Sequence, residues 1–195
     1  MQNELIQKLK NTIIEKSKDK SFLHNDWFVD YHLSIVEKIA LELCDIYKEA
    51  DKSLVLVLVW IHDYGKILDM KNQYDLNHKS KELLVEIGFT EDFIEKAMDY
   101  LDLMERKMEI DLKQAPIEIK IVSSADGASH FVGPFMRIYW KEYNNKNIAE
   151  LLDDNLKKIN KDWDNKIVLP EIKEKFLDRY LILKEQSGTL PEKFL

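Results

Sequence analysis

The sequence lacks most of what disulfide-rich, membrane-spanning or multidomain proteins require. Its single cysteine, Cys44, cannot form an internal disulfide. The longest apolar run, Leu54 to Ile61, is far shorter than the roughly 20 residues that cross a bilayer. With five glycines, four prolines and no stretch rich in either, the chain offers no flexible linker. We therefore expect one compact domain over residues 1–195 and no membrane span.

The sequence also lacks an excess of basic residues. Its 29 lysines and arginines face 36 aspartates and glutamates, which gives a net charge of -7. Proteins that bind nucleic acids displace counterions from the phosphate backbone with a basic patch, so a nucleic-acid partner is disfavoured. The first residues alternate charged and apolar side chains and contain no continuous apolar segment of the kind found in signal peptides. These features predict a cytoplasmic protein.

The sequence does contain clear helical periodicity. Apolar residues recur at intervals of three and four in several segments, for example from Ile35 to Leu43. Thr90, Pro116 and Pro170 stand where further helices are expected to begin. We predict an all-α fold, a single helical bundle.

Two apolar segments fit a strand as well as a helix. Leu54 to Trp60 (LVLVLVW) and Ile117 to Val122 (IEIKIV) are rich in β-branched residues and partly alternate. Periodicity alone leaves both assignments open. An isolated pair of strands among helices would have no sheet to join, which favours buried helices.

Four polar residues lie within or at the ends of these apolar segments. His32 is in phase with the apolar residues that follow it, His62 and Asp63 end one ambiguous segment, and Asp126 follows the other. Hydrogen-bonded core histidines and helix-end aspartates are the plainer interpretation of each residue alone. Together, buried carboxylates need a counter-charge or a metal ion. Imidazole nitrogen and carboxylate oxygen suit a divalent transition metal, and the set is too rich in nitrogen for calcium.

The order of these residues resembles the HD superfamily of metal-dependent phosphohydrolases. His32 comes first, His62 and Asp63 follow within WIHDYGK, and Asp126 lies within SSADGASHF. The resemblance covers about residues 22–140 and leaves a helix at each end of the chain as an addition. It implies an HD-type helical bundle in which both ambiguous segments are helices. It also implies that His32, His62, Asp63 and Asp126 bind one divalent ion, with Mn, Fe, Co, Ni, Zn and Mg as candidates.

The resemblance implies roles for two further residues. Lys66, three residues after the HD pair, would neutralise a substrate phosphate, and His78 stands where similar proteins often carry a histidine that touches phosphate or binds a second metal. The plainer alternatives are a surface lysine and a solvent-facing histidine. Family members with two or three metals carry a histidine pair before the final aspartate. Residues 91–125 contain no histidine, which favours one metal.

The predicted activity is hydrolysis of a phosphate ester or anhydride, with Asp63, Lys66 and His78 as catalytic residues and nucleotides among the substrates. The Glu-Asp pair that follows the HD pair in hydrolases of guanosine tetraphosphate is missing, which disfavours that substrate. Two alternatives remain: a sensor that binds a nucleotide or metabolite, and an interaction module that the metal only stabilises. The sequence leaves a homo-oligomer open.

Several other residues match no metal position in the family. For His130, four residues after Asp126, packing on the surface or in the core is favoured over a place beside the metal. His24 has no matching role either. The aromatic residues around the motifs are expected in the core rather than stacked on a nucleobase; they are Trp27, Tyr31, Phe131, Phe135, Tyr139 and Trp140.

Overall fold

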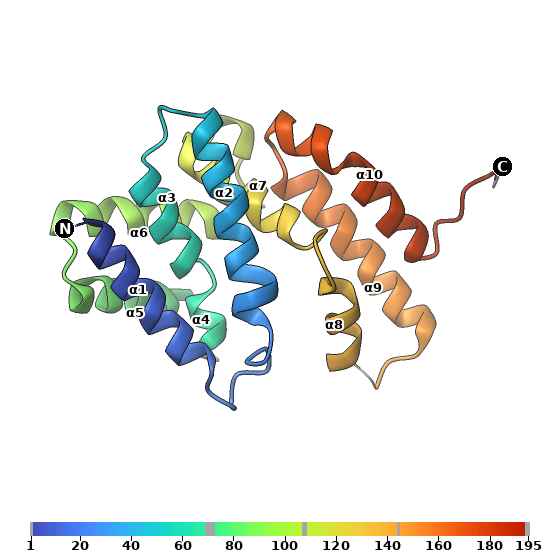
Figure 1. Ribbon diagram of the computed structural model, residues 1–195, viewed down its shortest axis with the longest axis horizontal. Coiled ribbons are helices and arrows are strands. Elements are labelled where there is room, and N and C mark those ends of the chain that lie inside the picture. The colour runs from blue at the N-terminus through green and yellow to red at the C-terminus, as the bar shows by residue number, and fades with distance from the viewer. Residues whose placement is uncertain (1, 69–72, 107–108, 144, 194–195) are drawn as a thin grey trace.

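The computed structural model describes residues 2–68, 73–106, 109–143 and 145–193 (Figure 1). These residues form helices and no strands, so the prediction of an all-α fold is confirmed. Three short turns accompany the α-helices: η1 (Val29–Leu33) and η3 (Asp162–Lys166) are π-helical, and η2 (Leu112–Gln114) is a 3-10 helix. The α-helices are α1 (Gln2–Ser17), α2 (Ser34–Ile46), α3 (Lys52–Ile61), α4 (Tyr64–Ile67), α5 (Gln73–Ile87), α6 (Glu91–Glu105), α7 (Ile117–Ser129), α8 (Phe135–Glu142), α9 (Ile148–Lys161) and α10 (Pro170–Gln186).

Both ambiguous segments are buried helices, as predicted. Leu54 to Trp60 lies in α3, and Ile117 to Val122 lies in α7. The side chain of Asp51 caps α3 by accepting hydrogen bonds from the backbone of the first turn. Helices α1, α2, α6 and α7 all pack against α3. Because α3 is covered on nearly every side, it needs no polar face, and its sequence shows no helical period.

The predicted helix starts agree with the structure in position. Helix α7 begins directly after Pro116, and Pro170 is the first residue of α10. Thr90 occupies the position before α6, but its side chain makes no capping hydrogen bond. Glu91 and Asp92 lie in the first turn instead, where negative charge interacts favourably with the helix dipole.

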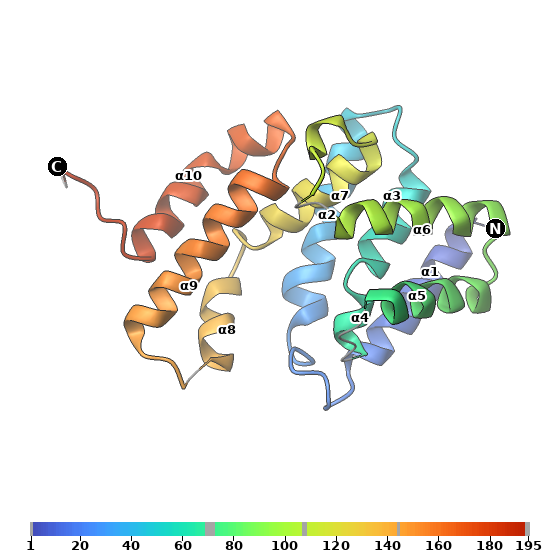
Figure 2. The ribbon, with the colours of Figure 1, turned by 180° about the vertical axis from the view of Figure 1, so that it is seen from behind.

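Helix α7 lies in the middle of the molecule (Figures 1 and 2). It packs against α2 and α3 of the N-terminal half and against η3 and α10 of the C-terminal half. Helices α9 and α10 lie side by side in both views and pack together. One cluster of buried apolar side chains extends from Ile6 in α1 to Ile172 in α10. The two ends of the chain thus contribute to the same core, although a single domain stays a prediction.

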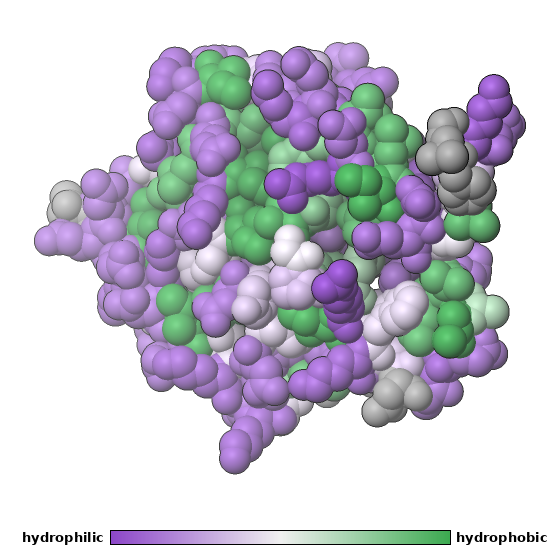
Figure 3. Space-filling view, turned by 45° about the vertical axis from the view of Figure 1, so that its right-hand side comes forward, coloured by the Kyte–Doolittle hydropathy of each residue, from purple (hydrophilic) through white to green (hydrophobic). Residues whose placement is uncertain are grey.

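Part of the apolar surface remains exposed on α10. Leu177, Leu181 and Ile182 are each about half exposed, at 45%, 52% and 53%. Figure 3 shows a face of the molecule on which apolar residues lie among hydrophilic ones. In the part of the chain that the structure describes, no helix combines the length and the hydrophobicity that crossing a membrane requires. The homo-oligomer stays a prediction.

Candidate metal centre

His32 enters the site from the π-helical turn η1. The backbone N–H of Ser34 bonds to the carbonyl oxygen of Val29, five residues earlier, which widens this turn before α2 begins. The imidazole of His32 is buried, with 2% of the residue exposed, as its phase with the apolar residues predicted. Its Nδ1 lies 3.0 Å from the hydroxyl of Ser129 in α7.

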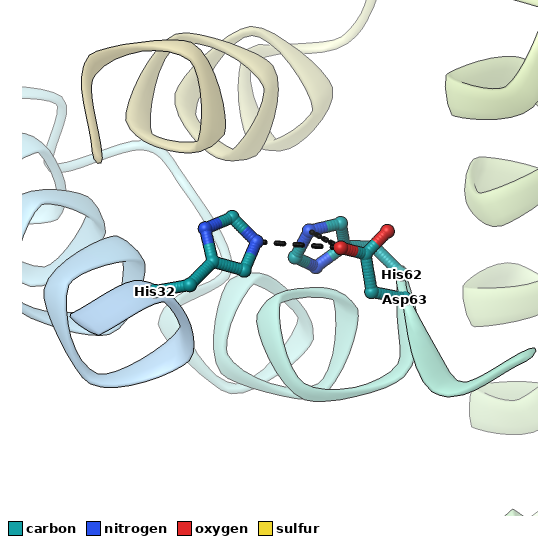
Figure 4. Close-up of side chains that lie close together, drawn as sticks. All are labelled: His32, His62 and Asp63. Atoms are coloured by element: carbon teal, nitrogen blue, oxygen red, sulfur yellow. Dashed lines mark ion pairs between the residues drawn. The ribbon is translucent and has the colours of Figure 1, made fainter. Parts of the chain in front are cut away.

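His62 and Asp63 enter the site from the end of α3 (Figure 4). Nδ1 of His62 lies 2.8 Å from the carbonyl oxygen of Val59, one turn earlier. Asp63 lies in the bend between α3 and α4. Its Oδ2 is 3.3 Å from Nε2 of His32 and 3.6 Å from Nε2 of His62. Two separate elements thus direct imidazole nitrogens towards one carboxylate.

Asp126 adds a second carboxylate from α7. Its Oδ1 lies 3.8 Å from Nε2 of His32 and 3.9 Å from Nε2 of His62. All four predicted ligands are buried. The structure therefore brings His32, His62, Asp63 and Asp126 together, and their binding of a metal ion stays a prediction.

The hydrogen bonds of the two histidines define which nitrogen carries the proton. A carbonyl oxygen only accepts, so Nδ1 of His62 donates to Val59. The hydroxyl of Ser129 donates to the carbonyl oxygen of Asp126, at 2.7 Å, so it accepts from Nδ1 of His32. Both imidazoles therefore turn the lone pair of Nε2 towards the aspartates.

This arrangement fits a bound cation. Among the described residues, no group forms a hydrogen bond with the buried Nε2 of His62. A lone pair that faces carboxylate oxygens is repelled by them, and a buried polar atom without a partner costs about 1–3 kcal/mol. A divalent ion among these atoms would remove both costs, because imidazole nitrogen and carboxylate oxygen are its usual ligands.

The pKa values of His32, Asp63 and Asp126 also suit a metal. Burial lowers the pKa of His32, although the charges of Asp63 and Asp126 act in the opposite direction. Burial by itself would raise the pKa of each aspartate. The charges of Lys66 beside Asp63 and of Lys166 beside Asp126 oppose that effect, and both pKa values lie well below the usual range. Neutral imidazole and ionised carboxylate are the forms that bind metals.

Lys66 lies beside the cluster, and His78 does not. On α4, Nζ of Lys66 is 2.7 Å from Oδ2 of Asp63, and its side chain reaches towards solvent. The exposed imidazole of His78 pairs with Glu82 on the same helix, at 3.0 Å. The structure does not bring His78 to the four ligands, and its catalytic role stays a prediction.

Two cavities meet at Asp63 and Lys66. The first, of about 150 Å³, also adjoins His62 and is lined by Asn77 and Ser80 of α5. The second, also about 150 Å³, lies between the N-terminal half and helices α8 and α9. It adjoins the cluster on one side and has lysines and aromatic rings around it; its lining includes His32, Lys158, Lys166, Trp27, Phe28, Phe135 and Tyr139.

Most of the aromatic residues expected in the core are there. Trp27 and Phe135 are buried in the core cluster, as expected, and they also line the second cavity together with the half-buried Tyr139. Tyr31 does not follow the expectation, because it is exposed. Phe131 follows the expectation: it is buried and packs against Trp163, with ring centroids 6.1 Å apart.

The C-terminal half contributes residues that the sequence did not reveal. Asp162 and Lys166 of η3 reach the site, where Nζ of Lys166 lies 2.8 Å from Oδ2 of Asp126 and 3.1 Å from Oδ1 of Asp162. His130 is buried, with its Nε2 3.7 Å from Oδ1 of Asp126 and its Nδ1 2.8 Å from Oδ2 of Asp162. The expectation of mere surface or core packing therefore missed polar contacts of His130. The only signal was a spacing of four residues in the pairs Asp126 with His130 and Asp162 with Lys166.

Small and hydroxyl residues of α7 allow η3 to come this close. The hydroxyl of Ser123 donates to the carbonyl oxygen of Lys166, at 3.1 Å, and the hydroxyl of Ser124 accepts from the N–H of Val168, at 3.1 Å. A Cβ atom on Gly127 would lie only 3.0 Å from the Cβ of Lys166. The SSADGAS segment thus fixes η3 against the ligands.

We predict that the metal-free protein loses stability in mild acid. Burial, and next the charge of Lys158, lower the pKa of His130 to about 3, and the pKa of His32 is also lowered. In the unfolded chain both histidines protonate below about pH 6.5. Stability is therefore complete above that pH and falls towards pH 3, by up to about 1.4 kcal/mol per pH unit for each histidine.

Urea unfolding in the presence of a chelator at pH 7, 6, 5 and 4.5 measures this slope. His130→Gln should reduce the slope by about half, because it removes one of the two groups. Equal free energies of unfolding at pH 7 and pH 5 would contradict the prediction.

The comparisons with known proteins agree with this cluster. The model of the HD domain family matches residues 29–129, which include His32, His62, Asp63, Lys66 and Asp126. No curated protein and no solved structure matches the chain. The match ends one residue before His130 and so leaves out all of α8, α9 and η3.

Proposed function

Because the chain belongs to the HD domain family of metal-dependent phosphohydrolases, we propose that it hydrolyses a phosphate ester or anhydride, with nucleotides among the candidate substrates. The observation that carries the proposal is the cluster of four buried ligand atoms with a lysine directly beside it. Lys66 is unnecessary for a metal that only stabilises the fold. A cation next to the metal ligands suits a phosphorylated substrate, whose charge one dication leaves partly unbalanced.

His32, His62, Asp63 and Asp126 would hold one divalent ion. Bound there, the ion would lower the pKa of a water molecule and polarise a phosphoryl oxygen. The carbonyl oxygen of Val59 orients His62, and the hydroxyl of Ser129 orients His32. The second oxygen of Asp126 is engaged by Lys166, which leaves Oδ1 directed towards the histidines.

The charges around the cluster favour a dianionic substrate. Three carboxylates, of Asp63, Asp126 and Asp162, are paired with three ammonium groups. With neutral imidazoles, the form that binds metals, the paired charges balance. One dication would then leave an excess of two positive charges, which equals the charge of a phosphate monoester at neutral pH. Longer polyphosphates carry more negative charge than the site would neutralise.

The second cavity supports a site for the phosphoryl group. Lys66, Lys158 and Lys166 line it together with His32 and Asp63, so a phosphate there would lie among cations and beside the ligand cluster. Trp27 and Tyr139 form part of the wall and offer contact to an organic group. The first cavity reaches His62 and Asp63 from the other side and supports separate access for water.

The proposal is tested by phosphate release from a panel of sugar phosphates and of nucleoside mono-, di- and triphosphates. The metal-free protein is assayed alone, with Mn²⁺ or Co²⁺, and with excess chelator. We expect hydrolysis that requires the added metal, with monophosphates as the better substrates. Thermal stabilisation by a nucleotide without turnover would contradict the proposal and favour a sensor instead.

Replacing Lys66 by alanine should lower kcat/KM by about a hundredfold. Removal of one group that stabilises transition-state charge costs about 2.7–4 kcal/mol, and each 1.36 kcal/mol is a factor of ten. Lys66→Arg should retain part of the activity because it keeps the charge. Lys157→Ala is the matched control, since Lys157 pairs with Asp153 on the exposed face of α9. An unchanged kcat/KM in Lys66→Ala would exclude the role, and His78→Ala in the same assay measures the predicted role of His78.

A further inference from the structure

His130 occupies a place in the ligand cluster that the family match does not include. We propose that His130 is a fifth ligand of the metal and that Asp162 is the positioning residue that holds it in the ligating orientation. This inference rests on the metal centre of the proposed function. It assigns part of that centre to residues that follow the matched segment.

The distance from His130 to Asp126 is similar to the distances from the two predicted histidine ligands to Asp126. Its Nε2 lies 3.7 Å from Oδ1 of Asp126, compared with 3.8 Å for His32 and 3.9 Å for His62 to the same oxygen. Atoms that share one ion at about 2.0–2.2 Å lie within about 4.4 Å of each other. Among the residues that the structure describes, His32, Asp126 and His130 are also one of two groups whose ligand atoms are close enough to hold an ion.

The hydrogen bond to Asp162 leaves the correct nitrogen of His130 available. An ionised carboxylate only accepts, so Nδ1 of His130 carries the proton and donates to Oδ2 of Asp162, at 2.8 Å. Lys158 and Lys166 pair with Asp162, at 3.2 and 3.1 Å, and keep it ionised. The lone pair of Nε2 is therefore free for a metal, and a carboxylate behind a ligating histidine is a recurring arrangement.

All three histidines of the cluster follow the same rule. Each donates from Nδ1 to a fixed acceptor: the hydroxyl of Ser129 for His32, the carbonyl of Val59 for His62, and the carboxylate of Asp162 for His130. Each imidazole therefore has its proton on Nδ1 and leaves the lone pair of Nε2 available to a metal. The ring of His130 contacts both Phe135, with centroids 4.3 Å apart, and His32, at 5.1 Å and nearly parallel. These contacts limit its rotation.

One ion accounts for the cluster better than two. The second group that can hold an ion consists of His32, His62 and Asp63, so both groups contain His32. His32 offers only its Nε2 to a metal, because its Nδ1 donates a hydrogen bond to Ser129. One nitrogen lone pair binds one ion. The two groups therefore cannot each hold an ion at the same time, which favours one ion over two.

Titration of the metal-free protein with Co²⁺ tests the inference without any substrate. Isothermal calorimetry gives Kd and stoichiometry, and the visible spectrum reports the ligand field. We expect the wild-type protein to bind one ion per chain. In His130→Gln, the Kd for Co²⁺ should rise by at least about tenfold and the visible spectrum should change. In Asp162→Asn, the Kd should rise by about 10–100-fold while the spectrum stays that of the wild-type protein. His24→Gln is the matched control; His24 pairs with Glu142 and is not part of the cluster.

An unchanged Kd and spectrum in folded His130→Gln, or two ions per chain, would overturn the inference. If the variants fail to fold, X-ray absorption of the Co²⁺-loaded wild-type protein counts the imidazole ligands: three support the inference and two reject it. Three imidazoles without phosphate release would reject only the proposed function, and phosphate release with two imidazoles would reject only the role of His130.

Discussion

Replacing Asp63 by alanine is expected to reduce phosphate release by at least about a thousandfold, since the metal contributes several kcal/mol to the transition state and each 1.36 kcal/mol is a factor of ten. The carboxylate of Asp63 lies within 3.6 Å of Nε2 of both His32 and His62 and pairs with Lys66. The substitution therefore removes a ligand, halves the negative charge offered to the ion and leaves Lys66 without its partner.

The measurement is kcat/KM at saturating Mn²⁺ or Co²⁺, together with the Kd of the metal. Asp153→Asn is the control, because Asp153 pairs with Lys157 away from the site. The loss should appear in both activity and metal affinity. The proposed mechanism predicts a loss of several kcal/mol. A folded Asp63→Ala variant whose activity stays within about tenfold of the wild-type protein would falsify it.

Replacing Lys166 by methionine should lower the free energy of unfolding by about 3–5 kcal/mol. Lys166 is buried, at 8% exposure, and its ammonium group bridges Asp126 and Asp162. Methionine fills a similar volume but leaves two buried carboxylates without that counter-charge. Burial lowers the pKa of Lys166, but the two aspartates outweigh this effect and hold the pKa above the usual range, so the charge is present at neutral pH.

Urea unfolding of the metal-free protein measures the loss, with the exposed Lys157→Met as the matched control. Added Mn²⁺ should restore part of the stability of Lys166→Met, because an ion bound beside Asp126 offsets the uncompensated charge. A loss below about 1 kcal/mol, the value typical of an exposed ion pair, would show that Lys166 and the two aspartates do not depend on each other.

The sequence predicted those parts of the site that adjoin apolar helical segments. His32 could be assigned to the core because apolar residues follow it with helical spacing, and the HD pair could be found because it ends a strongly apolar segment. The helical state of LVLVLVW required a tertiary argument. Its sequence has no polar face, and only the surrounding helices explain why.

The contacts across α7 could not be predicted in the same way. His130 and Asp162 are 32 residues apart, and Asp126 and Lys166 are 40 residues apart. Their contact depends on how η3 crosses α7, which Gly127 permits through the lack of a side chain. For His78, the resemblance to the family placed this part of the chain near the site but did not define which face of α5 turns inward. The neighbours Asn77 and Ser80 line the cavity instead.

The two π-helical turns have a consequence for how such a site is inherited. A π-turn contains one residue more than the α-helix around it, and η1 holds His32 while η3 holds Asp162 and Lys166. Loss of a single codon in either turn would restore regular α-helical hydrogen bonds at little cost to the backbone. The residues on one side would then rotate by about 100° and shift by about 1.5 Å relative to the other. One deletion in either turn would thus displace these side chains from the centre, although none of them is itself replaced.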